Sequence, residues 1–84
     1  MLNGFISIYL MELYDFNKLD HKEQLETIYK DATFLDNHVT TETRCNLYAL
    51  DMFFVEITYN SELNKITEIK SFKTGYLLDK YSNI

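Results

Sequence analysis

The chain contains the run Arg44-Cys-Asn-Leu-Tyr-Ala-Leu-Asp-Met-Phe-Phe-Val-Glu-Ile-Thr-Tyr59, followed by Asn64-Lys-Ile-Thr-Glu-Ile-Lys-Ser-Phe72. The first run has an alternating pattern of apolar and aromatic residues, which is the period of a β-strand with one buried face. In the second run, Ile66 and Ile69 are out of phase with such an alternation. Asp51 interrupts the first run and predicts a tight turn or bulge, and residues 60–64 predict a hairpin loop. The pattern therefore predicts three consecutive antiparallel strands, over residues 44–50, 52–59 and 65–72.

The alternation assigns the side chains of the middle strand to two faces of the sheet. Phe53, Val55 and Ile57 share one face, which we expect to pack against a helix. Met52 and Phe54 fall on the opposite face, and a core of one layer cannot bury both sets. Either another element, such as residues 1–14, covers that second face, or an apolar patch is left for a partner.

Residues 16–31 have the pattern of an amphipathic helix, with Leu25 and Ile28 on its apolar stripe. Asn17 or Asp15 could cap an earlier turn that contains Phe16 and Leu19. Asp20 and Glu23 have the spacing of a capping box, with Asp in place of the usual Ser or Thr. Residues 1–14 are apolar in too many directions to choose between helix and strand. Met11 is an alternative start of translation, and in that case residues 1–10 would be an appendage to the domain.

The flanking segments complete the predicted fold. Residues 33–40 have the pattern of a weaker strand. The strand over residues 65–72 is expected to contain a bulge or to lie at an edge of the sheet. Residues 76–81 predict a short helix, with Tyr81 available to pack back against the domain. Eighty-four residues make one domain. We expect a single α+β domain over residues 1–84, with an N-terminal helix, a four-stranded antiparallel meander and a short C-terminal helix.

Charge and composition restrict the classes of partner. Thirteen acidic and eight basic residues give a net charge of −5. This disfavours direct binding to nucleic acid, which needs clustered Lys and Arg, and favours a larger basic protein, including one that processes nucleic acid. The apolar stretch 5–14 is too short to span a membrane. Cys45 is the single cysteine, which suits a reducing compartment, so we expect a cytoplasmic protein in a bacterial or phage-infected cell.

The sequence has no recognisable catalytic or metal-binding motif. His21 and His38 belong to different predicted elements, and neither has a further ligand at metal-site spacing. Cys45 lacks a signature of an adjacent base and reads as a small buried hydrophobe. There is no glycine-rich phosphate loop. We therefore expect no enzyme, no cofactor and no metal.

Protein binding is the function that these observations favour. The candidate contact residues are apolar anchors on the sheet and carboxylates on and near the helix: Tyr48, Met52, Phe54, Asp20, Glu23, Glu26, Asp31 and Asp36. The apolar members would act as hot spots, and the acidic ones would steer the chain towards Lys- and Arg-rich surfaces.

Two other functions are compatible with the pattern. The chain could be a homodimer or larger assembly with a structural or accessory role, pairing its second sheet face or an edge strand with a copy of itself. An enzyme or small-ligand binder would need a deep pocket that places His38 or Cys45 beside a carboxylate.

Three segments carry a resemblance to known proteins: Leu13-Tyr-Asp-Phe-Asn-Lys-Leu-Asp-His-Lys-Glu-Gln-Leu25, Leu47-Tyr-Ala-Leu-Asp-Met-Phe-Phe-Val-Glu-Ile-Thr-Tyr59 and Ile69-Lys-Ser-Phe72. Over residues 11–81 the chain resembles a group of small uncharacterised α+β proteins of Bacteroidetes-type bacteria. The resemblance implies an acidic helix followed by a β-meander, and it implies no activity.

In size, charge and composition the chain is also similar to phage-encoded inhibitors, including anti-CRISPR proteins. That similarity implies an inhibitor of an RNA-guided nuclease that acts by protein–protein contact.

Overall fold

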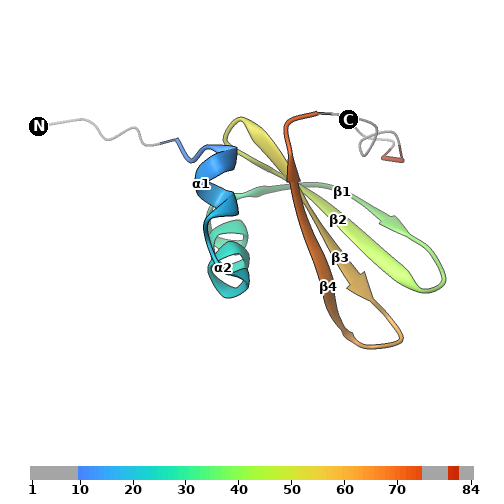
Figure 1. Cartoon of the computed structure of the whole chain (residues 1–84). Helices are drawn as coiled ribbons and strands as arrows, with labels where there is room; N and C mark the ends of the chain where they lie inside the picture. The colour runs from blue at the N-terminus through green and yellow to red at the C-terminus, as the bar shows by residue number, and fades with distance from the viewer. Residues whose placement is uncertain (1–9, 75–79, 82–84) are drawn as a thin grey trace, which may run out of the picture.

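The structure is a computed structural model, and it describes residues 10–74 and 80–81. Its elements are α1 (Leu13–Asn17), α2 (His21–Asp31), β1 (Thr33–Val39), β2 (Thr43–Leu50), β3 (Phe53–Asn60) and β4 (Lys65–Phe72). The strands form one antiparallel sheet in the order β1-β2-β3-β4, and the helices lie together at one end of it (Figure 1). This confirms the predicted α+β architecture of a helical segment followed by a four-stranded meander.

The short C-terminal helix predicted over residues 76–81 lies mostly outside the described residues. Of that segment the structure describes Lys80 and Tyr81, and neither is helical. Tyr81 does pack back onto the sheet, as expected, because only 6% of its surface is exposed.

The helix predicted over residues 16–31 is divided into α1 and α2. Asp20 causes the division, since its backbone is extended and its carboxylate caps α2. That carboxylate accepts the Glu23 backbone N–H at 2.8 Å, and the Glu23 carboxylate accepts the Asp20 N–H at 3.0 Å. The predicted capping box is therefore present, and it satisfies two amides that a helix start leaves unpaired.

The main core lies between the helices and one face of the sheet, which we call the helix face. Phe16 from α1 and Ile28 from α2 pack on it, against the β2 and β3 side chains Leu50, Phe53, Val55 and Ile57. The Phe16 and Phe53 rings are tilted with centroids 5.6 Å apart, a favourable aromatic geometry. The prediction that Phe53, Val55 and Ile57 face the helices is confirmed.

The two hairpin turns beside β3 use residues with positive φ. Asp51 has φ 53° between β2 and β3, and Asn64 has φ 56° between β3 and β4. With almost no glycine available, Asp and Asn are the residues that tolerate this conformation best.

The expected bulge is found in β4. Thr58 pairs with Glu68 and Tyr59 with Ile66, which leaves Thr67 as the extra residue. The bulge lets both Ile66 and Ile69 pack against the core on the helix face.

The opposite face of the sheet, which we call the second face, is covered in part. Cys45, Leu47 and Tyr81 form a smaller buried cluster there, and Phe54 and Phe72 pack against it. The rings of Phe54 and Phe72 are stacked, with centroids 5.8 Å apart. The described part of residues 1–14 does not contribute, because Met11 and Leu13 pack on the helix face.

Candidate functional site

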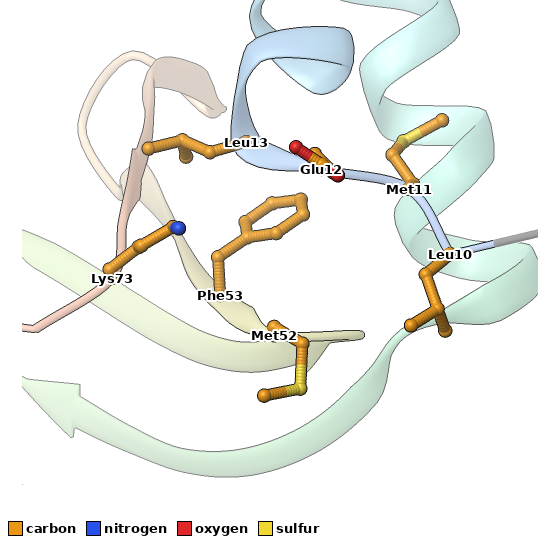
Figure 2. Close-up of a pocket in the computed structure, with 7 residues that line it drawn as sticks. All are labelled: Leu10, Met11, Glu12, Leu13, Met52, Phe53 and Lys73. Carbon is orange, nitrogen blue, oxygen red and sulfur yellow. The ribbon is translucent and has the colours of Figure 1, made fainter.

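An open hollow lies where the chain enters α1, beside the turn between β2 and β3 (Figure 2). Its volume is about 290 Å³, and its lining residues are Leu10, Met11, Glu12, Leu13, Met52, Phe53 and Lys73. Figure 2 shows the Phe53 ring in the middle of these side chains, with Leu13 on one side and Met52 on the other. Phe53 is almost fully buried, whereas Met52 is 77% exposed and Leu10 is 52% exposed. The hollow therefore has an apolar floor and two exposed apolar side chains.

Two further hollows follow along α2. The second is lined by Met11, Thr27, Asp31, Leu50 and Asp51, so it shares Met11 with the first hollow. The third is lined by Leu19, Glu23, Glu26, Thr27, Lys30 and Asp31 and shares Thr27 and Asp31 with the second. Neighbouring hollows share lining residues, and we call the three hollows together the helix groove.

The helix groove is apolar at one end and acidic towards the other. Its carboxylates are Glu12, Glu23, Glu26, Asp31 and Asp51, and its ammonium groups are Lys30 and Lys73. Asp51 also has a structural task, because its carboxylate accepts the Met11 backbone N–H at 2.6 Å. This hydrogen bond joins the segment before α1 to the β2–β3 turn at the junction of the first two hollows.

The structure brings five of the predicted contact residues to this region. Asp20, Glu23, Glu26 and Asp31 are exposed along α2, and Met52 lies in the β2–β3 turn. All of them except Asp20 line the groove itself. Its other apolar walls were not predicted. Leu10 and Met11 lie in the stretch whose pattern was ambiguous.

The remaining three predicted contact residues lie elsewhere. Tyr48 is opposite Val55 in the β2–β3 register and half-buried on the helix face, with its ring edge-on to Phe34. Phe54 is on the second face beside its cross-strand partner Phe72. Tyr48 and Phe54 therefore lie on opposite faces and do not form one patch. Asp36 is buried, with 9% of its surface exposed, and is separate from the acidic side of α2.

The second face holds a cluster of polar groups around Glu56. This carboxylate is 2% exposed, accepts the Tyr81 hydroxyl at 2.6 Å and pairs with the Lys80 ammonium at 2.8 Å. Desolvation and the hydrogen bond to Glu56 both raise the pKa of Tyr81. Burial acts to lower the pKa of Lys80, but the hydrogen bond and charge of Glu56 outweigh it and raise that pKa.

Cys45 and His38 lie near this cluster without forming a recognisable reactive centre. The Cys45 sulfur is 3.7 Å from Lys80 Nζ and 3.6 Å from Thr58 Oγ1, and its residue is 6% exposed. His38 is opposite Cys45 in the β1–β2 register, and its ring lies edge-on to Tyr81. Neither residue lines any of the three hollows. We interpret the cluster as the means by which residues 80–81 are held on the sheet.

Within residues 10–74 and 80–81, no three His, Cys, Asp or Glu side chains are grouped so as to hold a metal ion. No helix in the same part of the chain is long and apolar enough to cross a membrane.

Comparison with protein-family models, with the curated proteins and with the solved structures gave no match, so the site is interpreted from its own geometry.

Proposed function

We propose that the chain is a non-enzymatic protein-binding module that docks onto a larger, basic protein through the helix groove. One observation carries this proposal: exposed apolar side chains, Leu10 and Met52, border a hollow that continues into an acidic helix surface. An apolar centre flanked by charge is the composition of many protein–protein contact surfaces.

The two parts of the groove supply different components of binding. Fully burying a side chain such as Leu or Met contributes about 1.5–3 kcal/mol, so Leu10 and Met52 offer the affinity. Carboxylates such as Glu26 and Asp31 favour encounter with a basic surface and disfavour acidic partners. Their contribution falls at high ionic strength because exposed charges are screened.

A matched pair of charge variants tests the proposal. Glu26→Lys/Asp31→Lys reverses two carboxylates of the groove, and Glu42→Lys/Glu62→Lys makes the same change of net charge at two exposed loop positions outside it. Each protein serves as bait for affinity capture, and every captured partner is then purified and titrated against all three proteins.

A basic partner should bind the wild type and the loop variant and lose affinity for the groove variant. Equal binding by all three would refute the use of this surface, and the absence of any partner that binds as a purified protein would refute the proposal itself.

RNA-guided nucleases are one class of basic partner to include in the binary titrations. The reason for naming them is the similarity to phage-encoded inhibitors in size, charge and composition. Binding to such a nuclease, with inhibition of its cleavage, would place this chain among those inhibitors.

The alternative function is self-assembly through the β1 edge of the sheet. Phe34 is 53% exposed and Val39 is 58% exposed on this edge strand, and an unpaired strand edge can add a copy of itself. Light scattering distinguishes the alternatives, since a monomer mass throughout the micromolar range would exclude assembly as the main role.

A further inference from the structure

We propose that the element recognised by the helix groove is a linear segment of the partner that carries one large apolar side chain and, beside it, Lys or Arg. This inference rests on the proposed protein-binding function and specifies its ligand. It follows from the order of the three hollows, because each hollow shares lining residues with the next and the carboxylates of α2 lie beyond the first.

The first hollow has the properties of a pocket for a single apolar side chain. Phe53 forms a buried floor, Met11 and Met52 form parts of the wall and rim, and the charged residues Glu12 and Lys73 complete the lining. Its volume of about 290 Å³ lies just below the range of about 300–1,000 Å³ for small-molecule pockets, which suits a single side chain. Methionine side chains adapt to differently shaped guests, so the pocket should accept several large apolar residues.

The second and third hollows provide the sites for basic side chains. Asp31 borders both of them, and Glu23 and Glu26 border the third. These three carboxylates outnumber Lys30, the base on the same wall. A Lys or Arg next to the apolar anchor would reach them, and charge-assisted hydrogen bonds to carboxylates are stronger than neutral ones.

Hydrogen bonds position the backbone at two places along the groove. The Asp51 carboxylate holds the Met11 amide at the junction of the first two hollows, and the capping box of Asp20 and Glu23 fixes the start of α2 beside the third. A preformed groove lowers the entropic cost of binding, which favours recognition of an extended, flexible segment.

The charge of the groove also selects among possible occupants. Phosphate backbones and anionic lipid surfaces are repelled by an excess of carboxylates. A second copy of this chain also carries a net charge of −5, which disfavours it as the occupant. A basic linear peptide is the ligand whose charge complements the groove.

The test is a selection of random linear peptides on the immobilised chain, with binding of the enriched synthetic peptides measured by fluorescence anisotropy. Enriched peptides should share a large apolar residue close to Lys or Arg. Met52→Asp should weaken their binding about tenfold or more, since it places a charge in the apolar hollow. The matched control is Leu63→Asp, at another exposed apolar side chain in the β3–β4 loop, which should change the affinity less than about twofold.

Folding of each variant is checked by its circular dichroism spectrum, and Met52→Ala provides a milder version of the same change. The inference is overturned if no peptides are enriched, if the enriched peptides lack basic residues, or if both Met52 variants bind as tightly as the wild type.

Its failure is distinguishable from failure of the proposed function. A purified partner that responds to Glu26→Lys/Asp31→Lys but not to either Met52 variant would retain protein binding and refute the linear, apolar-anchored ligand.

Discussion

The two faces of the sheet are closed in different ways. On the helix face, Phe16 and Ile28 bury an apolar surface formed by β2 and β3, and the groove beside them stays open. On the second face, residues 80 and 81 close the surface by binding a buried carboxylate, Glu56. The helix face is closed by apolar contact area, whereas the second face combines a smaller apolar cluster with a buried carboxylate whose charge must be satisfied.

This difference assigns separate tasks to the two faces. Apolar burial is the main source of folding free energy, so the helix face supplies most of the stability. Burying a carboxylate costs free energy because the charge loses its water. Hydrogen bonds and ion pairs offset that cost only when the partner groups are in place. The second face is therefore closed conditionally, by the Tyr81 hydroxyl and the Lys80 ammonium, whereas the open groove is the surface free to bind.

The largest expected effect comes from breaking the helix face. Phe16→Ala removes a side chain with no exposed surface and leaves a cavity above Phe53, so it should cost about 3–5 kcal/mol of unfolding free energy. Small domains have total stabilities of about 5–15 kcal/mol, so the variant should be largely unfolded in mild denaturant. Urea titration monitored by circular dichroism measures this, and a loss below about 1 kcal/mol would contradict the assignment of the core.

A smaller loss is expected on the second face. Tyr81→Phe keeps the ring and removes the hydroxyl that Glu56 accepts, which should cost about 1–3 kcal/mol because a buried acceptor loses its donor. The same urea titration applies, with Tyr14→Phe as the control, since Tyr14 is 71% exposed. If the two Phe variants are equally stable, Glu56 is not what holds residue 81.

The cap of α2 should make a smaller contribution to the free energy of unfolding than the Tyr81 hydroxyl does. Asp20→Ala removes the acceptor of the Glu23 amide and should cost about 1 kcal/mol, whereas Asp20→Asn should keep most of the stability. The comparison of the two urea midpoints isolates the cap, because both variants remove the charge. A large loss in the Asn variant would show that the charge, and not the hydrogen bond, is what matters.

The smallest effect is a dependence of stability on alkaline pH. The folded state raises the pKa of Tyr81, so the unfolded chain releases this proton first as the pH rises, and stability falls above the unfolded tyrosine pKa of about 10. At that pH the loss from one such tyrosine is about 0.4 kcal/mol. Lys80 acts in the same direction, because its pKa is also raised.

Urea midpoints at a series of pH values measure this dependence. The wild type should lose more stability than Tyr81→Phe between neutral and alkaline pH. Parallel curves for the two proteins would contradict the placement of the Tyr81 hydroxyl on Glu56.

Much of the fold follows from local pattern. The alternation along residues 53–59, the capping box of Asp20 and Glu23, and the turn residues Asp51 and Asn64 are each signals within a few positions, and each was read correctly. The sequence allows a separate earlier turn containing Phe16 and Leu19, but its apolar spacing continues across Asp20 and does not show where one helix ends and the next begins. The structure places the break at Asp20, whose extended backbone caps α2.

The site was less predictable because its parts are distant in the sequence. Met52 was assigned to a strand by alternation, but the turn at Asp51 begins the strand one residue later and leaves Met52 in the hollow with Leu10 and Lys73. Glu56 and Tyr81 are 25 residues apart, and no periodicity links them. Their contact follows from how the chain returns to the second face, which only the three-dimensional structure shows.

The most direct test of this account is a chemical-shift map of the chain with a peptide enriched on the helix groove. Nitrogen-15-labelled protein is titrated with the peptide, and the amide shifts of the two faces are compared. The account predicts changes centred on Met11, Thr27, Asp31 and Met52, with Cys45, Glu56 and Tyr81 unaffected. Changes centred on the second face instead would contradict it, because they would make the conditionally closed surface, and not the open groove, the site of binding.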